Sequence, residues 1–195
     1  MTVNSLECLG RSRQPKKCKS IFEDRSGKMK VSQGKMHKFL GMTLNSTTTD
    51  EVVIVMLDHI KDLLSAFQKA EPKMKGTESS AAPSDFFKVN EDCKKLDSEK
   101  AVAFHNLTAK MLHAMKHARP DTCTAAAVFL MMRVQEPDED DWCKSCHLMK
   151  HVKGTKDLPL RLSANGGSVL KWWVDTSCAV HPNMHRHSRG GLLPG

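Results

Sequence analysis

The hydrophobic period of the chain changes near Asp58, and this change constrains the fold more than any other feature. Residues 52–56, Val-Val-Ile-Val-Met, are largely β-branched and predict a buried strand. The apolar residues that follow recur at the spacing of one helix face: Ile60, Leu63, Leu64 and Phe67. A strand that leads directly into a helix favours a fold of the α+β class.

Shorter patterns of the same two kinds predict the remaining elements. Further strands are expected at short β-rich runs: 30–32, 39–44, 158–162 and 169–174. Further helices are expected where the 3.6-residue period returns: 98–119, 122–134 and 137–154. The strand at 39–44 should pair antiparallel with 52–56, because only a short polar loop separates them. These short antiparallel strands and the central helices again indicate an α+β fold.

Side-chain patterns give these elements their expected faces and ends. Asp97 or Ser98 can cap the helix that begins there, and Arg119-Pro120 ends it. The buried face of that helix is predicted to carry five large apolar residues: Phe104, Leu107, Met111, Leu112 and Met115. Residues 71–95 read as a linker laid over a surface, anchored by Phe86, Phe87 and Val89.

Charge is distributed unevenly along the 195 residues, whose net charge is +8. Residues 1–38 hold ten Lys and Arg against three Asp and Glu, and residues 142–195 hold eight against two. The middle block, 39–141, is acidic, with twelve against seventeen. The two basic ends therefore predict contact with a polyanion such as nucleic acid, although a basic tail that only keeps the chain in solution is the alternative.

Composition excludes two classes of protein. The longest uninterrupted apolar run, from Ala125 to Met132, is far short of the roughly 18 residues that a membrane-spanning helix needs. The N-terminus lacks the basic and then apolar pattern of a secretory signal, and the seven Cys are an odd number. We therefore expect reduced thiols and a cytoplasmic or nuclear location.

The string Trp142-Cys143-Lys144-Ser145-Cys146-His147 carries the sharpest local pattern. C-x-x-C-H is the attachment pattern for c-type haem, but the missing signal argues against it. Cys143, Cys146 and His151 match three ligands of a zinc knuckle, whereas the fourth position is Lys156 instead of Cys. A structural zinc site needs four ligands, so ordinary helix residues are the alternative. His113 and His117 have a spacing that can bind metal, but an exposed helix face explains them equally well.

Several strings, in one collinear order over roughly residues 20–191, resemble copia-type retrotransposon Pol proteins. They include Gly34-Lys35-Met36-His37-Lys38-Phe39-Leu40-Gly41-Met42, His117-Ala118-Arg119-Pro120-Asp121, Lys153-Gly154-Thr155-Lys156-Asp157-Leu158 and Lys171-Trp172-Trp173-Val174-Asp175. The chain resembles the region in which the reverse transcriptase leads into ribonuclease H. The resemblance implies five segments: an unmatched, disordered tail (1–27), palm-end strands and a helix (28–70), the linker (71–95), a helical thumb or connection segment (96–155) and the start of ribonuclease H (158–195).

The resemblance also implies partners and site residues. Asp175 would be the first ribonuclease H carboxylate and a ligand of Mg²⁺ in the intact parent enzyme, while the fragment itself would hold no cofactor. Weak, non-specific contact with an RNA–DNA or DNA duplex is expected through the basic residues Lys150, Lys153, Lys156 and Lys171. The alternative is a small basic nucleic-acid-binding protein with a zinc knuckle-like helix.

Departures from the family pattern indicate an inactive fragment. The polymerase motif of paired aspartates is expected upstream of Lys28, where the only Asp is Asp24. The chain extends twenty residues past Asp175, and Arg189 stands where the family has Gly. Two-metal chemistry needs several carboxylates to hold the ions and align the attack.

We therefore predict that this chain has neither polymerase nor ribonuclease H activity, because Asp175 alone cannot position two Mg²⁺ ions. Primer extension and hybrid cleavage assays with Mg²⁺ should remain at background. Cleavage above background that Asp175→Asn abolishes would contradict this prediction.

Overall fold

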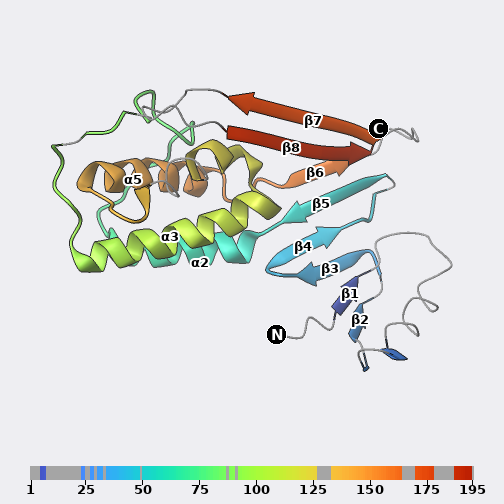
Figure 1. Ribbon diagram of the computed structural model, residues 1–195. Helices are drawn as coiled ribbons and strands as arrows, with labels where there is room; N and C mark the ends of the chain where they lie inside the picture. Colours follow the sequence, from blue (N-terminus) through green and yellow to red (C-terminus); the bar gives the residue numbers. More distant parts are fainter. Residues whose placement is uncertain are drawn as a thin grey trace.

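Helices gather at one end of the protein and a twisted sheet at the other, with a separate hairpin alongside them (Figure 1). This computed structural model describes residues 5–7, 23–24, 27–28, 30–32, 34–48, 50–86, 88–90, 92–126, 133–163, 170–177 and 187–194. Within 5–7, 30–32, 170–177 and 187–194 the description covers the backbone only. No helix within these ranges is long and apolar enough to cross a membrane.

Four antiparallel strands form the main sheet in the order β3-β4-β5-β6. Their bounds are Met36–Phe39 for β3, Met42–Asn45 for β4, Glu51–Val55 for β5 and Leu160–Ser163 for β6. The predicted antiparallel pairing of residues 39–44 with residues 52–56 is confirmed, with Leu44 opposite Ile54. Together with the helices this sheet makes the fold α+β, as the sequence predicted.

The expected single strand at 39–44 is wrong, because the chain reverses in the middle of it. Leu40 and Gly41 form a two-residue turn between β3 and β4, and both have positive φ, 48° and 79°. Two-residue hairpin turns of this type need φ > 0 at both positions, because only then does their twist match that of the strands. Glycine adopts this conformation freely, which makes Gly41 the local cause of the reversal.

The last strand of the main sheet also differs from expectation. The resemblance implies that residues 158–162 and 169–174 both belong to the start of ribonuclease H, but β6 pairs with β5, with Leu160 opposite Ile54. Strand β7 (Leu170–Ser177) instead pairs antiparallel with β8 (His187–Pro194), and β1 (Ser5–Glu7) pairs in parallel with β2 (Lys30–Ser32). Residues 160–163 thus belong with the strands of 36–55.

Among the described residues, three long helices form the other end: α2 (Leu57–Ala70), α3 (Ser98–His117) and α5 (Glu139–Gly154). The Asp97 side chain caps α3 by accepting a 2.8 Å hydrogen bond from the Lys100 backbone N–H, as predicted. Arg119 precedes the 3₁₀ helix η1 (Pro120–Thr122). The predicted helix 122–134 can be compared only in part, because residues 127–132 lie outside the described residues.

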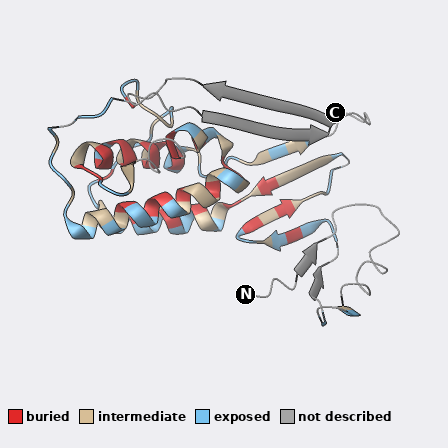
Figure 2. Ribbon diagram, in the orientation of Figure 1, coloured by how far each residue is buried: buried red, intermediate tan, exposed pale blue. Residues whose placement is uncertain are grey.

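The main hydrophobic core lies between these helices, where buried positions face one another (Figure 2). Of the predicted faces, Ile60, Leu63 and Phe67 are buried on α2, and Phe104, Leu107 and Met111 on α3. Leu64, Leu112 and Met115 are half-buried. The linker adds Met74 and Phe86 to this core, whereas Val89 is 40% exposed and is not the anchor that was expected.

A second, smaller core belongs to the sheet: Met42, Leu44, Ile54, Met56 and Ala118. Among the described residues it holds five buried members against fifteen in the helical core. Apolar burial is the main source of stability, at roughly 25 cal/mol per Å². The helical end should therefore be the more stable of the two.

Native-state hydrogen exchange should show this difference directly. We expect the slowest amides in α3 and α5, within the predicted stable segment 96–155, and faster exchange in β3–β5 and in Val169–Val174. Opening free energy follows the amount of apolar surface that each region buries. Protection of β5 or β7 equal to that of α3 would contradict this prediction.

Candidate nucleic-acid interface

Helix α5 carries two of the four basic residues that the sequence singled out, Lys150 and Lys153, and its two ends have opposite charge. Its first turn contains Glu139, Asp140 and Asp141, and its last turn contains His151 and Lys153. Acidic groups near a helix N-terminus and basic groups near its C-terminus both interact favourably with the helix dipole. The charge pattern therefore stabilises α5 and leaves its C-terminal end basic.

A capping box fixes the acidic end. The Asp138 carboxylate accepts from the Asp141 backbone N–H at 2.9 Å, and the Asp141 carboxylate accepts from the Asp138 N–H at 3.0 Å. The Arg133 guanidinium donates to both carboxylates, at 2.7 Å to Asp138 and 3.1 Å to Asp141. Burial raises the pKa of Asp141, although the Asp138 backbone hydrogen bond and the charge of Arg133 act to lower it.

The basic end is held by a buried arginine, which the sequence indicates only as a helix stop and as part of a family string. Arg119 is 2% exposed and donates to both carboxylate oxygens of Asp121, at 2.9 and 2.7 Å. It also donates to the backbone oxygen of Thr155 at 3.1 Å and to the Thr155 hydroxyl at 2.6 Å. Because the guanidinium has both a counter-charge and hydrogen-bond partners, its burial is tolerated. Arg119 thereby joins the end of α3 to the end of α5.

His151 extends this group of interacting side chains to the linker. Its Nε2 lies 3.2 Å from Asp121 Oδ2, and its Nδ1 lies 3.3 Å from the backbone oxygen of Glu78. One turn earlier, His147 Nε2 lies 3.0 Å from the backbone oxygen of Ser80. At Gly154 a Cβ atom would lie 3.1 Å from the Cβ of Thr77, so glycine lets the linker approach closely. Residues 77–80 thus run along the C-terminal half of α5.

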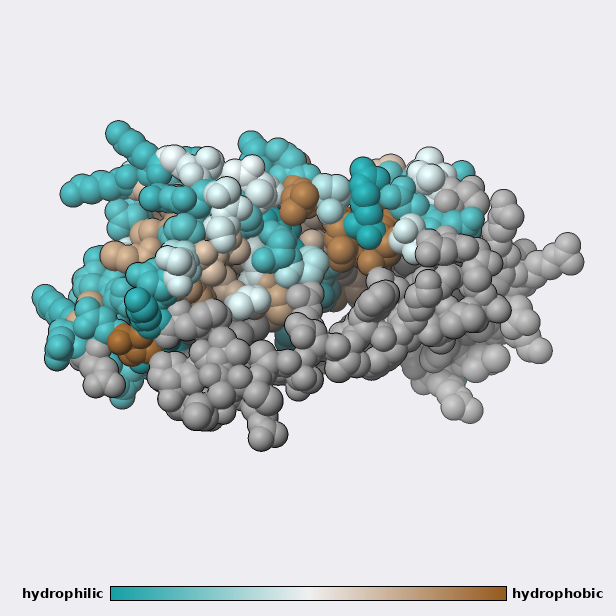
Figure 3. Space-filling model, turned by 90° about the horizontal axis from the view of Figure 1, so that it is seen from above, coloured by the Kyte–Doolittle hydropathy of each residue, from teal (hydrophilic) through white to brown (hydrophobic). Residues whose placement is uncertain are grey.

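The three predicted lysines of α5 and its following turn differ in their surroundings. Lys150 is half-buried, and its ammonium lies 3.8 Å from the Glu78 carboxylate. Lys153 and Lys156 are exposed, and neither forms an ion pair with any residue that the structure describes. Seen from above, the described surface is largely hydrophilic, with smaller hydrophobic areas (Figure 3). Of these three lysines, Lys153 and Lys156 are therefore better placed than Lys150 to bind phosphate.

Lys144 shows why a run of lysines in the sequence does not define a surface. It lies on the same helix but is 6% exposed, and it forms an ion pair with Asp140 at 2.8 Å. Its ammonium also donates to the backbone oxygen of Lys88. Lys144 therefore links α5 to the linker and is not available to a nucleic acid.

The remaining predicted site residues lie on β7. Lys171 is opposite Leu193, and Asp175 is opposite Arg189, in the pairing with β8. The side chains of β7 lie outside the described residues, so the Mg²⁺ role of Asp175 stays a prediction. Within the described residues, the one carboxylate group compact enough for a cation is Asp138, Asp140 and Asp141. These residues already bind Arg133 and Lys144, so they do not fit a Mg²⁺ site.

The zinc-knuckle residues do not converge. Among the described residues, Cys143, Cys146 and His151 do not belong to any group whose ligand atoms lie within 4.8 Å of one another. Burial raises the pKa of Cys146 to about 11, so its thiol is protonated at neutral pH. The other candidate pair contacts backbone oxygens. His113 Nε2 lies 3.0 Å from the oxygen of Leu40, and His117 Nδ1 lies 2.7 Å from the oxygen of His113.

Sequence reasoning missed the group formed by Arg119, Asp121, His151 and Thr155. Arg119 and Asp121 were noted within a family string, and His151 only as a zinc candidate. A basic residue flanked by Ala118 and Pro120 was the available signal that this arginine is not on the surface.

Comparison with models of known families, with curated proteins and with solved structures finds no match for this chain.

Asp121 should contribute to stability only above acidic pH. Burial raises the pKa of Asp121. The hydrogen bonds and charges of Arg119 and His151 lower it by more than burial raises it, so the net pKa lies below the ordinary 3.8. A carboxylate with a lowered folded-state pKa contributes stability above pH 3.8, and this contribution is lost as pH falls through the lowered value. Asp121→Asn should therefore reduce the loss of stability between neutral pH and about pH 3.

At neutral pH Asp121→Asn should lower the free energy of unfolding by about 1–3 kcal/mol, less than a fully buried pair, because the Asp121 side chain is 28% exposed. Urea unfolding at several pH values would measure both effects. Asp157→Asn, an exposed aspartate in the following turn, is the matched control and should be near neutral. Equal losses in the two variants would contradict a structural role for Asp121.

Proposed function

We propose that this chain is a segment of a copia-type retrotransposon Pol protein that binds nucleic-acid duplexes through their phosphates and catalyses no reaction by itself. The single observation that carries the binding proposal is a pair of exposed lysines at the end of α5, Lys153 and Lys156, which form no ion pair with the residues that the structure describes. The parent activities would be RNA-directed DNA synthesis and handling of the RNA–DNA hybrid, in the cytoplasm or nucleus. The collinear strings described above support this family assignment, which remains our proposal.

The position of these lysines favours a phosphate ligand. Unpaired ammonium groups on a surface attract a polyanion, and each phosphate contact releases condensed counterions. Because Arg119 and His151 fix the end of α5, the two ammonium groups project from a well-ordered segment. Contacts of this kind carry no sequence information, so binding should not distinguish one base sequence from another.

Binding should be weak and strongly dependent on salt. We expect the affinity for a fluorescently labelled RNA–DNA hybrid or DNA duplex to fall steeply between about 50 and 200 mM salt. Fluorescence anisotropy at several salt concentrations would measure the slope of log K against log salt. A tight complex that is indifferent to salt would refute phosphate binding.

The lysines of α5 can be tested against matched lysines elsewhere. Lys153→Gln with Lys156→Gln should reduce the salt slope by up to about 1.8, since each lost phosphate contact removes about 0.9 on B-form DNA. Lys61→Gln with Lys69→Gln removes the same charge from exposed positions of α2 and should have a smaller effect. Lys150→Gln alone should weaken binding less than Lys153→Gln, because Glu78 already lies near Lys150. Equal losses from the α2 and α5 pairs would mean that net charge, and not this site, governs binding.

A further inference from the structure

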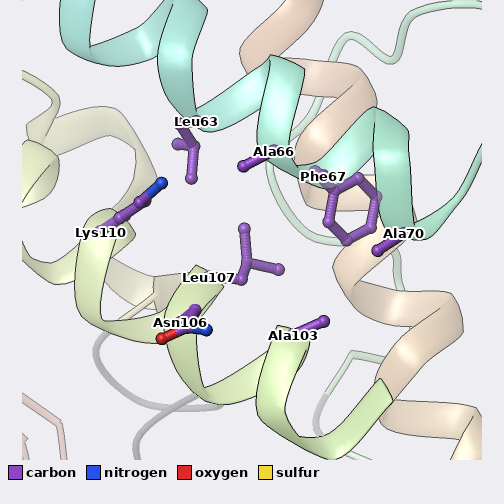
Figure 4. Close-up of a pocket in the computed structure, with 8 residues that line it drawn as sticks. All are labelled: Leu63, Ala66, Phe67, Ala70, Ala103, Asn106, Leu107 and Lys110. Atoms are coloured by element: carbon purple, nitrogen blue, oxygen red, sulfur yellow. The ribbon is translucent and has the colours of Figure 1, made fainter. Parts of the chain in front are cut away.

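Helices α2 and α3 pack side by side but leave a groove between them, with a volume of about 420 Å³ (Figure 4). Four residues of each helix line it: Leu63, Ala66, Phe67 and Ala70 from α2, and Ala103, Asn106, Leu107 and Lys110 from α3. Sites for small molecules typically have volumes of ~300–1,000 Å³. The groove is thus large enough for a small ligand.

The base of the groove is apolar, and its size depends on alanines. Leu63, Phe67 and Leu107 lie beneath the groove and are almost fully buried, so its accessible apolar surface comes from Ala66, Ala70 and Ala103. Ala66 and Ala103 lie on opposite helices, and any larger side chain there would occupy the space. An apolar ligand placed here would remove its own surface from water without displacing core side chains.

A positive charge lies at one end of this apolar groove. The Lys110 side chain extends from α3 toward Leu63 of α2, and Asn106 lies one turn earlier on the same side of α3 (Figure 4). Lys110 is half-buried, and it forms no ion pair among the residues that the structure describes. An ammonium without a counter-charge beside an apolar wall complements a ligand with a negatively charged head and an apolar body.

We propose that the α2–α3 groove binds a small amphiphilic carboxylate, of which a medium-chain fatty acid is the simplest example. The alkyl chain would lie against Ala66, Ala70 and Ala103. The carboxylate would accept hydrogen bonds from the Lys110 ammonium and the Asn106 amide. This site is separate from the end of α5 that we propose to bind phosphate. Its test does not depend on the proposed function.

Two probes of equal chain length separate the charged and apolar contributions. Octanoate and 1-octanol would be titrated into the full-length ¹⁵N-labelled protein, and backbone amide shifts would be followed. Octanoate should bind saturably and shift amides of residues 63–70 and 103–110. It should also bind more tightly than octanol, because only octanoate gains the charge-assisted contact with Lys110.

Two variants and a control decide the assignment. Lys110→Gln should weaken octanoate about tenfold and leave octanol unchanged. Lys116→Gln removes an exposed lysine from the last turn of the same helix and should change neither affinity. Ala103→Phe should abolish binding of both probes by filling the groove. If that variant does not fold, the comparison of Lys110→Gln with Lys116→Gln still gives the answer.

Three results of the binding experiments would overturn the proposal. These are no saturable octanoate binding, equal affinities for octanoate and octanol, and equal effects of the Lys110 and Lys116 substitutions. Sedimentation velocity distinguishes the main competing occupant. A dimer that Ala103→Phe dissociates would show that a second copy of the chain covers the groove, and this too would overturn it.

Discussion

The buried guanidinium of Arg119 is the interaction on which the joining of the helical and sheet regions depends. Its neighbour Ala118 is buried in the sheet core, whereas Arg119 reaches Asp121 and Thr155 at the end of α5. Thr155 is followed after five residues by β6, which pairs with β5. The arginine therefore fixes the point from which the chain returns to the main sheet. Without it, only His151 and the close approach of the linker at Gly154 would hold the helix end from which the chain leads to β6.

A second connection joins the two regions through neighbouring residues. Met56 is the N-cap of α2 and belongs to the sheet core, while Ile60, one turn later, belongs to the helical core. His113 on α3 contacts the backbone oxygen of Leu40 in the β3–β4 turn, and His59 on α2 contacts that of Lys110 on α3. The hairpin turn is thus held against the helices. Each contact needs its histidine but uses only a backbone oxygen of the partner, so it does not depend on the side chain of Leu40 or Lys110.

What could be predicted from the sequence follows from how local each signal is. The face of α2 and the cap of α3 depend on residues within one or two turns, and both were predicted correctly. The β3–β4 turn was missed because Leu40-Gly41 lies inside an apolar run, where the usual polar turn residues are absent. The pairing of β6 with β5 joins residues more than one hundred positions apart, such as Ile54 and Leu160, and no local pattern carries that information. Lys144 and Lys153 look alike in the sequence, and only the fold places the first beside Asp140 and the second on the surface.

The separation of buried and exposed groups decides which positive charges of α5 are available to a ligand. Glu78 of the linker lies near Lys150 and is held beside α5 by the contact between its backbone oxygen and His151. One half of the helix end is therefore partly neutralised by a carboxylate from another segment, while Lys153 and Lys156 extend beyond it. A surface built in this way presents two charges at a defined place, in contrast to the dispersed positive charge of a flexible tail. The same reasoning applies to Lys110, whose charge matters because it stands beside an apolar groove and not because of its contribution to the net charge.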